Sequence, residues 1–187
     1  MTLDLAGCSD GELAALALAG RQAAYGALMQ RHRDGVYRLV RGHIGDADAA
    51  LDVTQQSFLA AFSALSRYDG TRPFRLWIAR IAINKCHDWA RRRAVRRMLS
   101  FALPIDEAAQ VADHGATPET LAADRQELER TMKAIGTLPL ALRDTLVLRT
   151  IEGLSQAETA EVLGISEKAV ETRLYRARAR LQERLRD

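Results

Sequence analysis

The residues best suited to chemistry in this chain are basic side chains near its C-terminus. Residues 166–187 contain seven Lys or Arg and four Asp or Glu, a net charge of +3. Cations of this kind neutralise DNA phosphates, and polar groups beside them can hydrogen-bond to base edges. The basic side chains that helical spacing leaves away from an apolar stripe are Lys168, Arg173, Arg176, Arg178 and Arg180.

The segment 154–180, LSQAETAEVLGISEKAVETRLYRARAR, has the layout of a helix-turn-helix that would position these cations. Ser155 and Glu158 form a Ser-x-x-Glu capping box at the start of a first helix. Gly164 supplies the turn, because glycine enters left-handed backbone geometry at low cost. Ser166 can cap a second helix, which would enter a DNA major groove. Its inward positions at helical spacing are Val170, Leu174, Ala177, Leu181 and Leu185.

A second basic segment lies at residues 72–97, with nine Arg or Lys against one acid, a net of +8. Its cationic end, Arg91 to Arg93, can hold phosphates, and Asn84 could read base edges. The loop before it could receive a base turned out of its stack. Trp77 and Trp89 fit either a core position, the commoner fate of such residues, or a base-stacking platform. A basic run can also be merely a solvated helix face.

An acidic segment separates the two basic ones. Residues 104–129 carry seven acids and one base, a net of −6. Such segregation of charge suggests two nucleic-acid contacts with something different between them. Residues from about 98 to 117 show no sustained period and contain Pro104 and Gly115. We therefore expect a flexible acidic linker over residues 98–118.

Composition excludes several classes of protein. Hydrophobic residues make up 48% of the 187 residues, so a packed core is expected. No apolar run approaches the roughly 20 residues that span a bilayer, and the N-terminus does not read as a secretory signal. Cys8 and Cys86 suggest neither a disulfide framework nor a zinc site, and His87 has no second ligand at suitable spacing. We expect a cytoplasmic protein with no direct membrane insertion, catalytic set, metal site, cofactor or small-molecule substrate.

The helices that carry these segments can be placed from caps, breaks and apolar spacing. The predicted ranges are about 9–19, 22–43, 46–65, 74–97, 119–135, 140–151, 155–163 and 166–185. In the third of them Leu51, Phe58, Leu59 and Phe62 are predicted to face inward. No strand is predicted. The fold class is all-α: two small helical domains, 8–97 and 119–187, joined by the linker 98–118, with a helix-turn-helix in the second.

Three segments together resemble bacterial RNA polymerase sigma factors. RPFRLWIARIAINKCHDWARRR resembles the helix that melts and reads the −10 region, and ALDVTQQSFLAAF the segment that grips the polymerase clamp. LPLALRDTLVLRTIEGLSQAETAEVLGISEKAVETRLYRARARL resembles the domain that reads the −35 element. Their order and the chain length are similar to the compact extracytoplasmic-function (ECF) subfamily.

The resemblance implies site residues for three contacts. For the −10 region it implies Tyr68, Arg72, Phe74, Asn84, Lys85, Asp88, Arg91, Arg92 and Arg93, to which the basic segment adds Arg75 and Arg80. For the −35 region it implies Glu171, Thr172, Tyr175 and Arg176, to which the basic helix adds Lys168, Arg173 and Arg178. For core polymerase it implies Asp52, Gln55, Gln56 and Phe58.

Three assignments keep two interpretations each. Phe58 is either a polymerase contact or a core residue. Glu171 is either a specificity residue, since a carboxylate can accept from a cytosine amino group, or a partner of Lys168 or Tyr175 within its helix. The acidic linker either mimics RNA charge inside the polymerase or is a solvated tether.

The predicted function is that of a promoter-specificity subunit without enzymatic activity. Its expected partners are core RNA polymerase, promoter DNA and, by resemblance, an anti-sigma factor that holds it inactive. A free-standing helix-turn-helix regulator would explain residues 154–180 but not the second basic segment. A third alternative is a helical adaptor that binds only proteins. Salt dependence separates the two, because DNA binding by a promoter-specificity subunit with its polymerase should weaken steeply as salt rises.

Overall fold

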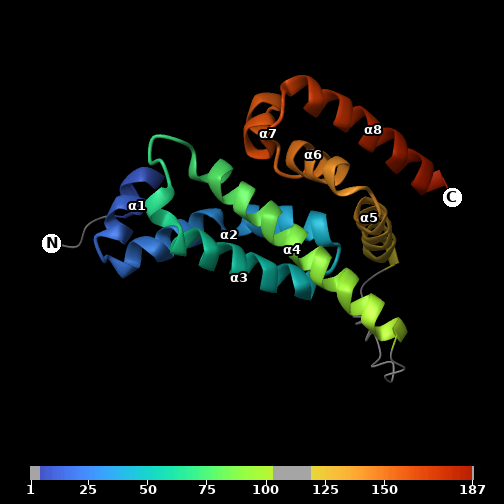
Figure 1. The fold of residues 1–187 in the computed structure, drawn as a ribbon, viewed down its shortest axis with the longest axis horizontal. Coiled ribbons are helices and arrows are strands. Elements are labelled where there is room, and N and C mark those ends of the chain that lie inside the picture. Colours follow the sequence, from blue (N-terminus) through green and yellow to red (C-terminus); the bar gives the residue numbers. More distant parts are fainter. Residues whose placement is uncertain (1–4, 103–118, 187) are drawn as a thin grey trace.

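The part of the chain that is described, residues 5–102 and 119–186 of a computed structural model, is helical and contains no strand (Figure 1). The N-terminal helices are α1 (Asp10–Leu18), α2 (Gln22–Ile44), α3 (Ala47–Ser63), the 3-10 turn η1 (Leu65–Arg67) and α4 (Phe74–Ala102). The C-terminal helices are α5 (Glu119–Gly136), α6 (Leu140–Thr150), α7 (Gln156–Leu163) and α8 (Glu167–Arg186). The predicted all-α class is confirmed.

Local hydrogen bonds fix the helix ends that the sequence predicted. Ser9 and Ser155 each close a capping box with the glutamate three residues on, at the starts of α1 and α7. Asp46 accepts from the backbone N–H of Ala49 at 2.9 Å and begins α3. Gly164 ends α7 with φ of +65°, where a side chain would be strained. These ends depend on residues three or four positions apart, so the sequence alone specifies them.

Helices α1 to α4 pack into one bundle in the lower part of Figure 1. Leu28 and Leu39 of α2, Phe58 of α3 and Ile78 of α4 are all nearly inaccessible in its centre. Burial of each such side chain contributes about 1.5–3 kcal/mol to folding. Helices α2 and α3 pack tightly against α4 and therefore support the basic segment 72–97, most of which lies in α4.

Helices α5 to α8 form a second unit, with α6 to α8 at the top of Figure 1 and α5 at its right, in which α8 packs along α6 and α7. Val170 and Ala177 of α8 are fully buried, and so are Val147 and Leu148 of α6, the helix that α8 contacts. Leu174, Leu181 and Leu185 are half-buried. The predicted inward face of this helix is confirmed.

The two units share an interface in which α2 contacts α5 and α6, and α4 contacts α7. The hydrophobic core is continuous across it, including Val40 on one side and Leu146 on the other. Gly42 of α2 lies so close to Ile151 and Val147 that a Cβ there would collide with the Ile151 side chain. The sequence predicted two domains but contained no sign of this contact.

Two predictions about these elements were wrong. Leu51 and Leu59 of α3 are 58% and 61% exposed, although apolar spacing placed them inward. The buried line of α3 instead runs through smaller residues such as Ala50, Val53 and Ala61, because its neighbours approach that side closely. Helix α4 also continues to Ala102, five residues past its predicted end; the rest of the predicted linker, residues 103–118, lies outside the described residues.

No helix within the described ranges is both long and apolar enough to traverse a lipid bilayer.

Candidate nucleic-acid interface

The predicted −35 face lies on the exposed side of α8. Tyr175 is 77% exposed, and Thr172, Arg176 and Arg178 are also exposed, whereas Arg173 is half-buried. Residues 168, 172, 175 and 176 follow helical spacing and lie along one side of α8. Ser166 accepts from the N–H of Ala169 at 3.2 Å and fixes where this helix starts. The fold thus presents most of this predicted set to solvent together.

Glu171 forms an ion pair with Lys168 within α8. The Lys168 Nζ lies 2.8 Å from Glu171 Oε2, and the hydrogen bond to this carboxylate raises the pKa of Lys168. Both side chains are more than half exposed, so solvent screens the pair and it contributes little to stability. This structure therefore contains the within-helix pair that is one interpretation of Glu171. A DNA base could displace Lys168 from it at small cost.

The loop before α4 is held by local bonds and an aromatic cluster. The Asp69 carboxylate accepts from the backbone N–H of Thr71 at 3.0 Å and from its hydroxyl at 2.7 Å, and the Tyr68 hydroxyl donates to the carbonyl of Arg72. The ring of Tyr68 lies 5.2 Å from those of Phe74 and Trp77, centroid to centroid. Contacts among its own residues and with α4 therefore hold the loop that is predicted to capture a base.

Two predicted contact residues are core side chains and need correction. Phe74 is 0% exposed and Phe58 is 2% exposed. Phe74 packs beneath Tyr68 and Trp77, and also near His32 of α2, so it supports the loop and does not reach its surface. Phe58 packs against Phe62 inside the bundle, which favours its core interpretation over a polymerase contact. Burial depends on neighbouring helices, so periodicity alone could not separate these cases.

The exposed surface of α3 carries the other predicted polymerase-binding residues. Asp52, Gln55 and Gln56 are all exposed, beside the exposed Leu51 and Leu59. Gln56 accepts from Arg92 of α4 at 3.4 Å, which joins this surface to the basic end of α4.

The basic second half of α4 is exposed and internally paired in places. Arg91, Arg92 and Arg93 are exposed; Arg91 pairs with Asp88, and Arg93 lies over the Trp89 ring at 5.1 Å from its centroid. Trp89 is half-buried and packs against the core, which accords with the core interpretation. Asn84 is exposed and Lys85 is half-buried.

The first turns of α4 face the C-terminal unit. Arg75 forms an ion pair with Glu158, and Arg72 lies 3.2 Å from Glu161, both acids of α7. A guanidinium nitrogen of Arg80 would lie 3.2 Å from a Cβ at Gly164. A cavity of about 130 Å³ remains between the loop and α7, lined by Tyr68, Arg72, Trp77, Arg80, Glu161 and Val162 among others. In this structure α7 therefore lies over the predicted −10 site.

A second interdomain contact buries a carboxylate between two imidazoles. Asp144 of α6 accepts from His43 of α2, with 2.6 Å between His43 Nε2 and Oδ1, and from His87 of α4, with His87 Nε2 at 3.0 and 3.1 Å from its oxygens. The His43 and Asp144 side chains are 1% and 7% exposed, and that of His87 is 28% exposed. We call these three residues the His–Asp–His cluster.

Burial and hydrogen bonding shift the pKa values of this cluster in opposite directions. Burial lowers the pKa of His43 despite its bond to Asp144, whereas that bond raises the pKa of the more exposed His87. Burial alone would raise the pKa of Asp144, but the two imidazole hydrogen bonds outweigh it and lower the pKa. The cluster therefore contains an ionised carboxylate and a neutral His43 near neutral pH.

The members of this cluster lie far apart in the chain, and for this reason sequence reasoning missed it. His43 and Asp144 are 101 residues apart, and His87 and Asp144 are 57 apart. Local spacing around His87 therefore shows no second ligand. No local signal could have found the cluster, since only the packing of α6 onto α2 and α4 assembles it.

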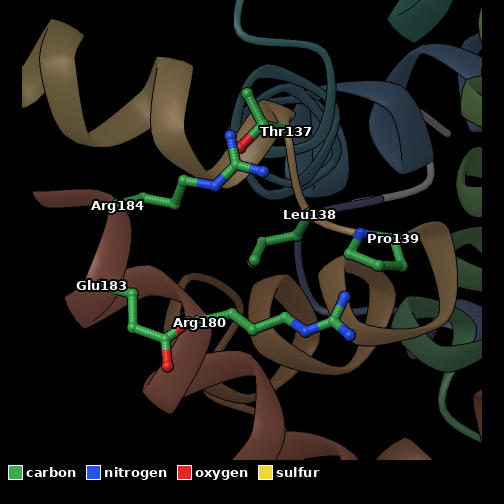
Figure 2. A pocket seen from close by; sticks show the side chains of 6 residues that line it. All are labelled: Thr137, Leu138, Pro139, Arg180, Glu183 and Arg184. Atoms are coloured by element: carbon green, nitrogen blue, oxygen red, sulfur yellow. The ribbon is translucent and has the colours of Figure 1, made fainter. Parts of the chain in front are cut away.

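Another cavity, of about 280 Å³, lies away from these surfaces at the turn between α5 and α6 (Figure 2). It is lined by Thr137, Leu138, Pro139, Arg180, Glu183 and Arg184. Figure 2 shows Arg184 extending toward Thr137, and Arg180 toward Pro139. It lies toward the C-terminal end of α8, and none of its lining residues belongs to a predicted contact set.

Two protein families match the chain, one over the part that carries the first basic segment and the other over the part that carries the second. The family described as Sigma-70 region 2 matches residues 28–96, and Sigma-70, region 4 matches residues 128–181. The first range contains α3, the loop and most of α4, and the second contains α6, α7 and most of α8.

Whole-chain relatives agree with these matches. RNA polymerase sigma factor CnrH of Cupriavidus metallidurans is 42% identical over 177 residues, which cover 92% of each chain. ECF RNA polymerase sigma factor SigM of Mycobacterium tuberculosis is 33% identical over 92% of this chain and 83% of its own. The structure of CnrH in complex with the cytosolic domain of CnrY superposes with a TM-score of 0.69 at 36% identity, covering 94% of this chain and 96% of the other.

Proposed function

Because the chain belongs to the ECF subfamily of RNA polymerase sigma factors, we propose that it binds core RNA polymerase and reads a promoter at its −35 and −10 elements. The observation that carries this proposal is the match of both sigma regions, in order, to the two units that bear the basic surfaces. We further propose that it acts in the cytoplasm and has no catalytic activity of its own.

For the −35 element we propose duplex reading by the exposed side of α8. Lys168, Thr172, Tyr175 and Arg176 share that side, and Arg178 is exposed near it. Glu171 is proposed to select a base once Lys168 moves to a phosphate, and half-buried Arg173 to support the face from its edge. A helix in the major groove needs a few such side chains at base edges and others at phosphates.

For the −10 region we propose capture of an unstacked base at the loop 68–73. Tyr68 and Trp77 offer aromatic faces there, Arg72, Arg75 and Arg80 offer cations, and Asn84 lies further along the same helix. Aromatic stacking is worth about 1–3 kcal/mol per base, which offsets the cost of unstacking. Lys85, Asp88 and Arg91 to Arg93 are proposed to border this site and hold the backbone beyond it.

For core polymerase we propose the exposed surface of α3, made of Asp52, Gln55 and Gln56 together with Leu51 and Leu59. Polymerase binding would have to move α7 away from the −10 loop, since α7 lies over it here. We also propose that an anti-sigma factor controls the protein. The complex of the related CnrH with CnrY, a protein partner, supports this part of the proposal.

In vitro transcription with core polymerase across a genomic library tests the function. We expect initiation at a limited set of promoters that share two elements, and none without the chain. Gel filtration should show stable co-elution with core polymerase. A chain that binds duplex DNA specifically without polymerase, and does not co-elute with it, would instead be a free-standing regulator.

A further inference from the structure

The His–Asp–His cluster has the donor set of a metal site. Its three side chains come from three helices, α2, α4 and α6, and from both units of the fold. Both imidazoles direct Nε2 to the same carboxylate, and the potential ligand atoms all lie within 4.8 Å of one another. Two imidazoles and one carboxylate are typical ligands of zinc and similar ions.

The distances allow an ion with small movements. Ligand atoms at about 2.0–2.1 Å from a tetrahedral zinc are separated by about 3.3 Å. The His87–Asp144 distances of 3.0 and 3.1 Å are close to that value, and the 2.6 Å between His43 and Asp144 would lengthen by a few tenths of an ångström or slightly more. Side-chain rotation alone can supply such shifts.

The hydrogen bonds around Asp144 leave its carboxylate to the two imidazoles. Arg143, the neighbour of Asp144, directs its guanidinium hydrogen bonds to the backbone carbonyls of His43, Gly136 and Leu138, although its charge still acts on both Asp144 and His43. The negative charge of Asp144 therefore meets only imidazoles among the described hydrogen-bond partners. His87, with 28% of its side chain exposed, lies on the solvent side, where an ion could enter and a water could complete the coordination.

We propose that His43, His87 and Asp144 bind a divalent transition-metal ion of the zinc class, and that the bound ion holds the two units together. The ligands reach the ion only when α6 packs on α2 and α4, so the ion stabilises that packing and no other arrangement. In the same packing α7 lies over the −10 loop. Metal binding thus reduces promoter reading, a consequence that rests on the proposed function, although the binding itself does not.

The test of binding uses the full chain, freed of metal, in competition with a chromophoric chelator for Zn²⁺. We expect one ion per chain, and a loss of affinity of about 100-fold or more for His87→Ala, since even outer partners of such sites contribute 10–100-fold. His87 is partly exposed, so this variant should fold. The matched control is His32→Ala, which removes a histidine hydrogen-bonded to an aspartate, Asp10, at 2.9 Å within one unit.

The two variants give opposite outcomes under the proposal. The His32→Ala chain should bind Zn²⁺ as the parent does, and Co²⁺ should give visible absorption of a tetrahedral site without a thiolate band. Equal affinity of the two variants, absence of competition with the chelator, or a thiolate band, which would place the ion at a cysteine, would each overturn the site.

Transcription separates this proposal from the function. With saturating Zn²⁺ the parent chain should show weaker promoter opening than the chelated chain, and His87→Ala should not respond. A chain that binds Zn²⁺ but never supports transcription would overturn the function and leave the site. Transcription that is normal, with no Zn²⁺ binding, would overturn only the site.

Discussion

The two proposed DNA-reading surfaces differ in what covers them. On α8 the side that carries Tyr175 and Arg176 is open to solvent. At the start of α4, by contrast, Arg72 and Arg75 pair with Glu161 and Glu158 of the chain's own helix-turn-helix. One unit thus offers its reading surface while covering that of the other. The difference indicates that availability of the −10 surface depends on how the units pack, whereas the −35 surface depends only on the local fold of α6 to α8.

The largest expected effect is on the open surface. Arg176→Ala should reduce −35-dependent transcription by about 10- to 100-fold, because a bidentate contact to a base contributes about 1–3 kcal/mol. Binding to core polymerase should not change, since α8, which carries Arg176, lies far from α3 in the fold (Figure 1). Promoter-specific run-off transcription measures the first and gel filtration the second. Loss of core binding would contradict the assignment.

A bulky side chain between the units should uncover the other surface. Gly42→Leu would collide with Ile151 across the interface, so we expect a larger radius of gyration in solution scattering and tighter binding to single-stranded −10 DNA, by about tenfold or less. Gly26→Leu is the control, because Gly26 is on the same helix with nothing within 4 Å of an added Cβ. If both variants behave alike, the interface does not control access.

Charge reversal should sharpen the comparison with a smaller effect. Glu161→Arg removes the partner of Arg72 and should strengthen single-stranded −10 DNA binding several-fold, since exposed ion pairs contribute about 0–1 kcal/mol. Glu183→Arg changes net charge equally but lies toward the far end of α8, away from the −10 loop. Fluorescence anisotropy at two salt concentrations would measure both. An equal gain in the control would point to net charge alone.

The smallest effect concerns pH. Glu152 follows α6 and lies between the units, where a Cβ at Gly35 would be 3.3 Å from its Oε2, and burial raises its pKa above the ordinary 4.5 despite Arg38 and Arg75 nearby. A raised acid pKa means that the folded state disfavours the charged form. The resulting loss of folding stability is absent below pH 4.5 and grows as the pH rises through the folded-state pKa of Glu152.

Glu152→Gln should therefore stabilise the fold by about 1 kcal/mol or less at pH 7 and leave it unchanged at pH 4. Denaturant unfolding at the two pH values measures the difference. A gain of the same size at both values would show that the charge of Glu152 is not the cause.

Most helix ends, and the segments that are basic, follow from the amino-acid sequence alone. Capping boxes at Ser9 and Ser155 and the left-handed Gly164 operate within a few residues, so their geometry follows from local chemistry. The exposed face of α8 followed from apolar spacing for the same reason. The resemblance to sigma factors was also readable in the sequence, because each of its three motifs is a continuous stretch of chain.

Which faces are covered was settled by tertiary packing. Leu51 and Leu59 are exposed, and Phe58 and Phe74 are buried, because helix neighbours, not periodicity, set burial. The His–Asp–His cluster and the pairing of α7 acids with the −10 arginines join residues dozens of positions apart. Such contacts depend on where whole helices pack, and this packing is the sum of many weak interactions that no short stretch of sequence contains.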